Sequence, residues 1–190
     1  FGISMAFLQD IRAAGEDTTG DGKPLLFAVY YCWYHDGTHP DYPYEHWTYE
    51  SSNENENALA AQREGEPPPN SAARPIAGRD FYDSRNHEVA EWHVELAMNA
   101  GIDAFLVDWW ATHKGLDQNM EQGILSAAME KNFRIALFDE RAQFHNDFEW
   151  YKNQVVNALG RYMDLPVYLH IDGRPVYYLY QVAAGPSLTP

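Results

Sequence analysis

The sequence predicts an α/β fold with a parallel sheet, and three observations lead to this prediction. Apolar runs of strand length alternate with segments whose apolar residues recur at helical spacing, an order that favours parallel strands joined by right-handed crossovers. The strongest run, Ile102–Trp110, has seven apolar or aromatic residues among nine and follows Gly101, which is typical of a strand buried on both faces. This run ends in Asp108, Trp109 and Trp110, at the strand end where ligands bind in such folds.

The first part of the chain contains one strand and a long loop insertion. A short helix is expected near the start, from apolar residues at Ile3, Phe7, Leu8 and Ile11. The apolar and aromatic run Leu25–Tyr34 predicts the first strand. Residues 35–80 are too many for a tight connection, and we expect their aromatic part, through Trp47, to fold over a pocket. The Glu-, Asn- and Pro-rich remainder is expected to be solvated.

Alternating helices and strands follow this insertion. Asp83, Ser84 or Asn86 could cap a helix that runs to Asn99, and Gly101 ends it before the strand Ile102–Trp110. The next elements expected are a helix over about Leu116–Lys131, a strand over Phe133–Phe138 and a helix over about Asn146–Met163. A hairpin with an Asp-Gly turn follows over Leu165–Gln181. Its second arm, Pro175–Tyr180, is the fourth core strand.

Four parallel strands and three crossover helices amount to half of a TIM-like (β/α)8 barrel. Such a barrel takes about 250 residues, whereas the chain has 190 residues. Four strands in an open sheet would leave a bare edge, which natural proteins normally cover. We therefore expect residues 1–190 to form a single partial barrel domain, the amino-terminal half. Its partner would be the carboxy-terminal half, in the same longer chain or in another copy.

Charge and apolar content exclude several classes of protein. Thirteen basic and twenty-eight acidic residues give a net charge of −15, which repels nucleic acid and anionic membrane surfaces. No apolar run approaches the length of about 18 residues that a membrane span requires. The single cysteine, Cys32, excludes an internal disulfide bond and a thiolate metal site.

No metal or cofactor is expected from the sequence. The spacing of His35, Asp36, His39 and Asp41 would suit a metal site, but a polar loop of this kind is more often hydrogen-bonded and solvated. A helical pair of histidines, which would strengthen a metal interpretation, is absent from the sequence.

The aromatic content predicts a carbohydrate-binding protein. The chain has six Trp, thirteen Tyr and nine Phe, many of them grouped at strand ends and in one loop. Flat aromatic rings match the apolar face of a pyranose, while neighbouring acids bind its hydroxyl groups. The alternative is a large aromatic core, which composition alone does not distinguish from a binding surface.

Two carboxylates flanking a glycosidic bond would suit hydrolysis, at about 5 Å apart for retention or about 6.5 to 9.5 Å for inversion of configuration. Asp139 and Glu140 cannot form this pair together, because successive strand residues point to opposite faces. Asp108 could pair with either of them, since both follow neighbouring strands. In the alternative interpretation these acids bind substrate hydroxyl groups or arginines such as Arg141.

The sequence also resembles glycoside hydrolase family 99, the endo-α-mannosidase and endo-α-mannanase group, and related glycan-active barrels of polysaccharide biosynthesis. Motifs similar to those of the family occur in the same order: YYCWY at Tyr30–Tyr34, the pair His46 and Trp47, FYDSRNHEV, AGIDAFLVDWW, RIALFDER and RPVYYLY. Two positions differ, because Asp108 stands where the family usually has Ser, and Phe138–Arg141 replaces a His-(Ile/Leu)-Glu-Pro-Tyr segment.

The resemblance implies a retaining, endo-acting enzyme in which the sugar's own 2-hydroxyl group attacks, through an anhydro-sugar intermediate. The family's catalytic glutamates lie in a late Asn-Glu-Trp-x-Glu motif, which these 190 residues lack, so this chain alone would be inactive. The implied role of Asp108, Asp139 and Glu140 is then to hold hydroxyl groups. The implied substrate-binding residues are Tyr31, Trp33, Tyr34, His46, Trp47, Trp109, Trp110 and Tyr180.

The expected function is therefore that of a glycoside hydrolase acting on an α-mannoside or related polysaccharide, in a secreted or periplasmic protein. Two alternatives remain. The chain could be a non-catalytic carbohydrate-binding fragment, which the missing glutamates permit, or part of a glycan-biosynthesis enzyme of the related type.

Overall fold

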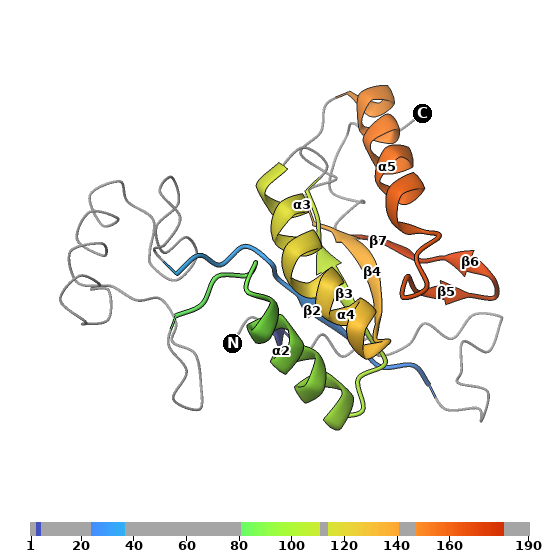
Figure 1. Cartoon of the computed structure of the whole chain (residues 1–190). Coiled ribbons are helices and arrows are strands. Elements are labelled where there is room, and N and C mark those ends of the chain that lie inside the picture. Colours follow the sequence, from blue (N-terminus) through green and yellow to red (C-terminus); the bar gives the residue numbers. More distant parts are fainter. Residues whose placement is uncertain (1–2, 5–23, 37–80, 111–113, 141–146, 181–190) are drawn as a thin grey trace.

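The computed structural model of the chain describes residues 3–4, 24–36, 81–110, 114–140 and 147–180. A five-stranded sheet lies at its centre, in the order β1-β2-β3-β4-β7 (Figure 1). Four strands pair in parallel and confirm the predicted α/β fold: β2 (Phe27–Tyr30), β3 (Ala104–Asp108), β4 (Arg134–Asp139) and β7 (Tyr177–Leu179).

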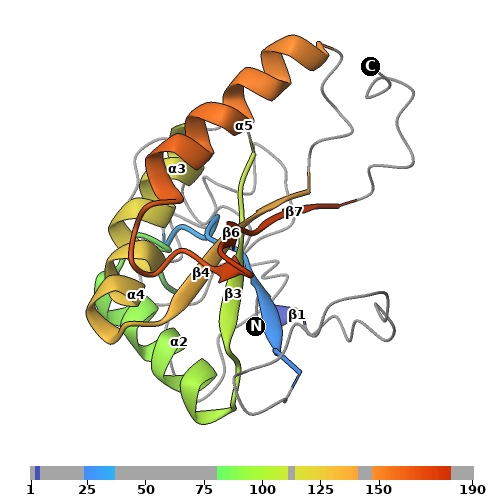
Figure 2. The same ribbon diagram turned by 90° about the vertical axis from the view of Figure 1, so that its right-hand side faces the viewer.

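The described helices all cover the same face of this sheet. They are α2 (His87–Asn99), α3 (Lys114–Met120), the π-helical turn η1 (Glu121–Leu125), α4 (Ser126–Lys131) and α5 (Phe148–Tyr162). Figure 2 shows the helices together on one side of the curved sheet. Helices on a single face are typical of a barrel, because an open doubly wound sheet carries helices on both faces. None of the described helices is long and apolar enough to cross a membrane.

Local sequence signals explain where the helices begin and end. The side chain of Asn86 accepts a hydrogen bond from the backbone N–H of Val89 at 3.2 Å, so Asn86 is the residue that caps α2. Asp147 caps α5 in the same way, with 2.9 Å to the N–H of Trp150. Gly101, after α2, has a φ of 75°, a conformation that glycine adopts without strain and that ends the helix.

The predicted hairpin is present, but its role in the sheet differs from the prediction. Strands β5 (His170–Ile171) and β6 (Arg174–Pro175) flank the Asp-Gly turn. The first arm also pairs with β4, through a parallel bridge between Ile135 and Tyr168, and β7 then pairs with the later part of β4. Both arms therefore contribute to the fourth position of the sheet, because each covers a different part of the same edge.

Two further predictions are corrected at the ends of elements. A helix was expected to begin near Ile3, and this prediction is wrong at Ile3 and Ser4. These two residues form β1 (Ile3–Ser4), which pairs antiparallel with the outer edge of β2. The backbone groups on that edge of β2 need partners, which explains a strand at this place. The expected single helix over about Leu116–Lys131 begins at Lys114 and contains the π-helical turn η1.

Candidate functional site

Side chains at the carboxyl ends of the strands divide between two faces of the sheet. The helix-covered face includes Tyr30, Trp109 and Asp139, because each bonds to a helix. The Tyr30 hydroxyl lies 3.0 Å from Nδ1 of His93 in α2, and the Tyr151 hydroxyl in α5 donates to Asp139 Oδ2 at 2.6 Å. Since successive strand residues alternate between faces, the residue next to each of these belongs to the opposite face.

That opposite face carries three aromatic rings in contact, from the ends of β2 and β3. The rings of Tyr31 and Trp33 are stacked, with centroids 4.3 Å apart and an interplanar angle of 19°. The ring of Trp110 meets Trp33 edge to face, with centroids 5.7 Å apart. All three side chains are half-buried. We call Tyr31, Trp33 and Trp110 the aromatic platform.

Two carboxylates contact this platform. The indole N–H of Trp110 donates to Asp108 Oδ1 at 3.2 Å, and the hydroxyl of Tyr31 donates to Glu140 Oε2 at 3.4 Å. Burial, together with the charges of Glu140 and Asp108, raises the pKa of Tyr31 well above its ordinary value. The hydroxyl of Tyr31 therefore stays protonated at neutral pH and can donate a hydrogen bond.

A second group of rings adjoins this face from the ends of β4 and β7. Phe138 pairs in register with both Asp108 and Tyr178. Its ring stacks on that of Tyr178, with centroids 5.3 Å apart, and lies 5.8 Å from the ring of Tyr180. Tyr180, which we predicted to bind substrate, is 43% exposed at this end of the sheet.

Trp109 and Asp139 were expected at this site, but the structure places them under the helices. Trp109 is 2% exposed and donates from its indole N–H to Asp117 Oδ1 in α3 at 2.9 Å. Asp139 is 0% exposed, and its Oδ2 accepts from the hydroxyls of Tyr151 and Tyr177 at 2.6 and 2.8 Å. The expectation is wrong for both residues because each directly neighbours a residue of the open face and so points the other way.

Tyr34 lies beside the platform, and both Tyr31 and Trp33 pack against it. It is buried, and its ring packs against Tyr82 with centroids 5.7 Å apart. Its contact with Trp33 is edge to face, at 6.5 Å. The other two expected binding residues, His46 and Trp47, lie outside the described residues.

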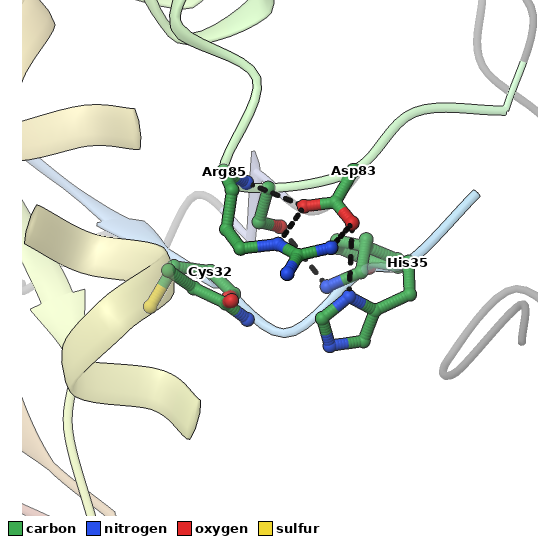
Figure 3. A network of polar contacts seen from close by, with 7 residues as sticks. Cys32, His35, Asp83 and Arg85 are labelled. Carbon is green, nitrogen blue, oxygen red and sulfur yellow. Dashed lines mark hydrogen bonds and ion pairs between the residues drawn. The ribbon is translucent and has the colours of Figure 1, made fainter. Parts of the chain in front are cut away.

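A polar cluster that was not predicted from the sequence lies next to the platform, and it is formed by His35, Asp83 and Arg85. Asp83 Oδ2 lies 3.1 Å from Nδ1 of His35, and the guanidinium of Arg85 binds both oxygens of Asp83, at 2.9 and 2.6 Å (Figure 3). Burial acts to raise the pKa of Asp83, but the hydrogen bonds from Arg85 and His35 outweigh it and hold this pKa well below its usual range. The signal in the sequence was Asp83 two residues before Arg85, whereas Asp83 was expected only as a helix cap.

Metal binding receives no support within the described part of the chain, where no group of three or more His, Cys, Asp or Glu residues could hold an ion. His35 and Asp36 belong to that part, and His35 is bound to Asp83. His39 and Asp41 lie outside it.

The platform and its two carboxylates are suited to a ligand that has both apolar faces and hydroxyl groups. Aromatic rings provide flat apolar surface, and Glu140 accepts a hydrogen bond at its rim, whereas Asp108 is 1% exposed and is held by the indole of Trp110. The carboxyl ends of parallel strands are also the place where barrels bind their ligands.

Comparisons with known proteins show the family and the fold. A family model described as glycosyl hydrolase family 99 matches residues 23–186. One solved structure of the endo-α-mannosidase of that family from Bacteroides thetaiotaomicron is 16% identical, with a TM-score of 0.65 over 83% of this chain and 45% of the other. Another, in complex with bis-tris-propane, is 16% identical, with a TM-score of 0.62 over 83% of this chain and 42% of the other. No curated protein matches the chain.

These likenesses confirm the predicted parallel (β/α) barrel fold, of which this chain covers part. The chain spans less than half the length of the two solved structures.

Proposed function

Because the chain belongs to glycosyl hydrolase family 99, we propose that it is the sugar-binding half of a retaining, endo-acting glycoside hydrolase. The proposed substrate is an α-mannoside or a related polysaccharide. The name of the similar solved structures, endo-α-mannosidase, supports this substrate class.

The observation that carries the proposal is the aromatic platform with its two carboxylates on the face that the described helices leave open. In this proposal Trp33 and Trp110 stack against pyranose rings, and Glu140 and the hydroxyl of Tyr31 bind sugar hydroxyl groups. Asp108, which is 1% exposed, orients Trp110 through its hydrogen bond. The hydrogen bonds from Trp110 to Asp108 and from Tyr31 to Glu140 fix both acids relative to the rings that they flank. Fixed polar groups beside an apolar surface orient a sugar as well as bind it.

The catalytic carboxylates are proposed to come from the remainder of the barrel. Of the three acids predicted from the sequence, Asp139 already binds two tyrosine hydroxyls, which leaves Asp108 and Glu140 on the open face. The retaining mechanism, in which the sugar's 2-hydroxyl group attacks with assistance from a glutamate, is carried over from the family resemblance. Glu140 directly, and Asp108 through Trp110, would then hold the sugar in the conformation that this attack requires.

The net charge favours a neutral glycan as the substrate. The chain carries 28 acidic and 13 basic residues, and two acids belong to the proposed binding face. A sulfated or carboxylated polysaccharide would be repelled by this field, whereas a mannan would not.

Calorimetric titration of the chain with a neutral α-manno-oligosaccharide and with a sulfated polysaccharide tests the proposal. Saturable binding of the manno-oligosaccharide alone is expected. The proposal is contradicted if the chain binds neither glycan, or binds only the sulfated one.

A second candidate function is non-catalytic carbohydrate binding. The observation in its favour is that Asp108 and Glu140 each accept a hydrogen bond from a platform ring, as binding residues would. Reducing-end release from α-mannan, measured on the longest protein that contains these residues, separates the two functions. Release of new ends identifies a hydrolase, and binding without release identifies a binding protein.

A further inference from the structure

The segment that carries two of the platform rings continues beyond the paired part of its strand. The parallel pairing of β2 with β3 ends at Tyr30, and residues 31–36 follow without a regular strand. Tyr31 and Trp33 therefore depend on other contacts for their position. A ring that is free to move would lose conformational entropy when a sugar binds, so its support affects affinity.

Contacts on both sides of Trp33 hold this segment. Before Trp33, the carbonyl oxygen of Cys32 accepts a hydrogen bond from the side-chain amide of Asn119 at 2.8 Å. After Trp33, the backbone of Tyr34 makes two hydrogen bonds with Ser84, from Tyr34 N–H to Ser84 Oγ at 3.0 Å and from Ser84 N–H to the Tyr34 carbonyl oxygen at 2.8 Å. Cys32, Tyr34, Ser84 and Asn119 are all buried, so these bonds are shielded from water.

The ion pair next to Ser84 extends this support by one residue. Asp83 bonds to His35, which directly follows Tyr34, at 3.1 Å. Arg85 holds the carboxylate of Asp83 from the other side through its backbone N–H at 2.7 Å and through two guanidinium nitrogens. Figure 3 shows Asp83 between Arg85 and His35. A carboxylate bound at both oxygens has a fixed orientation, so its hydrogen bond also fixes the orientation of the His35 imidazole.

We propose that Asp83, fixed by Arg85, is a positioning residue that holds Trp33 against Trp110 through its bond to His35. The consequence for sugar affinity rests on the proposed function, whereas the consequence for ring geometry does not. Asp83 itself touches no platform ring in the contacts described above. Its effect is transmitted along two residues of backbone, from His35 through Tyr34 to Trp33.

The test compares Asp83→Asn and Arg85→Lys with Asp147→Ala in the whole chain. Asn keeps the size of Asp83 but loses its charge and one acceptor oxygen, and Lys keeps the charge of Arg85 but lacks the planar pair of nitrogens that binds the two oxygens in parallel. Asp147→Ala removes the cap of α5 and serves as the control, because it lowers stability without touching residues 31–36.

The first readout is the exciton couplet that the Trp33 and Trp110 indoles give in far-ultraviolet circular dichroism, because their rings are in contact. Trp33→Phe assigns the couplet by removing it. At a temperature where every variant is folded, Asp83→Asn and Arg85→Lys should weaken the couplet, and Asp147→Ala should leave it intact. A positioning role is thereby separated from a loss of stability alone.

The second readout is the dissociation constant for a neutral α-manno-oligosaccharide. Asp83→Asn should raise it by about tenfold, since one or two rings must be ordered when the sugar binds, and Asp147→Ala should leave it unchanged. An unchanged couplet and an unchanged dissociation constant in both Asp83→Asn and Arg85→Lys would overturn the inference. If the unmodified chain bound no sugar while the couplet still depended on Asp83, the proposed function would fail and the positioning role would stand.

Discussion

At the scale of single residues, two pairs of neighbours divide between the helix-covered face and the open face of the sheet. Trp109 packs under α3 whereas Trp110 belongs to the platform, and Asp139 bonds to α5 whereas Glu140 contacts Tyr31. Each pair follows from the two-residue period of an extended chain, which sends neighbours to opposite faces. Residues of similar chemistry therefore have different surroundings at adjacent positions.

The tryptophan pair gives a direct comparison. Trp110→Ala should weaken binding of an α-manno-oligosaccharide about tenfold and change the stability little, because Trp110 is only half-buried. Trp109→Ala should cost about 3–5 kcal/mol in the free energy of unfolding, since Trp109 is 2% exposed. Calorimetric titration and urea unfolding of both variants check this. Equal effects of the two substitutions on stability would show that Trp110 is a core residue.

The tyrosines bound to Asp139 predict a dependence of stability on pH. Burial, followed by the charge of Asp139 and the contact with Tyr151, raises the pKa of Tyr177 in the folded chain far above the value of about 10 expected when unfolded. The contribution of Tyr177 to stability is thus complete below about pH 10 and is lost as the pH rises further, because only the unfolded chain ionises there.

Urea unfolding of the unmodified chain and of Tyr177→Phe, between pH 8 and pH 11, measures this contribution. The stability difference between the two proteins should be constant up to about pH 10 and should shrink above it. A difference that stays constant to pH 11 would show that Tyr177 titrates normally.

At the scale of elements, the π-helical turn η1 supports the segment that precedes α2. A Cβ atom added at Gly123, in η1, would lie 2.0 Å from the backbone oxygen of Ser84. Glycine is needed there because the helix and the backbone of Ser84 approach so closely. Ser84 in turn bonds to the backbone of Tyr34. The packing of η1 against Ser84 therefore stabilises the hydrogen bonds that hold the segment with Trp33 in place.

Gly123→Ala should therefore destabilise the chain, although alanine normally favours a helix by about 1 kcal/mol over glycine. Gly160→Ala is the matched control, because Gly160 lies in α5 with no neighbouring atom within 4 Å of the added Cβ, and it should stabilise by about 0.5–1 kcal/mol. Denaturant midpoints measure both changes. If Gly123→Ala also raised the midpoint, η1 would not pack tightly against Ser84.

The elements were largely predictable from the sequence, and the faces of their residues were not. Continuous apolar runs such as Ile102–Trp110 indicate strands, and Asn86 and Gly101 mark the ends of α2. In a strand that is buried on both faces, polar and apolar residues do not alternate. The sequence of such a strand therefore does not indicate which of its side chains face the helices. For that reason Trp109 and Asp139 were expected at the binding site, although both lie on the helix-covered face. The π-helical turn also lacked a signal, because it does not interrupt the apolar spacing.

At the scale of the whole molecule, the sheet gathers side chains from distant parts of the chain at one end. The platform was predictable, because it follows from placing the ends of parallel strands together. The polar support was not, because its bonds join residues far apart, such as Cys32 and Asn119, which are 87 positions apart. Which distant polar groups meet depends on how the helices pack, and this leaves no local pattern in the sequence.

The sheet also shows where the rest of a barrel is proposed to attach. The order β2-β3-β4-β7, with all described helices on one face, corresponds to consecutive barrel strands. Since the chain covers 42–45% of the solved structures that it matches, we propose that further strands continue from β7. The platform would then line the mouth of the closed barrel.

A crystal structure of the chain with a bound neutral α-manno-oligosaccharide tests the central claim most directly. The account predicts a pyranose ring in contact with Trp33 or Trp110 and a sugar hydroxyl group within hydrogen-bonding distance of Glu140. A sugar bound to the helix-covered face, or away from these three side chains, would contradict it.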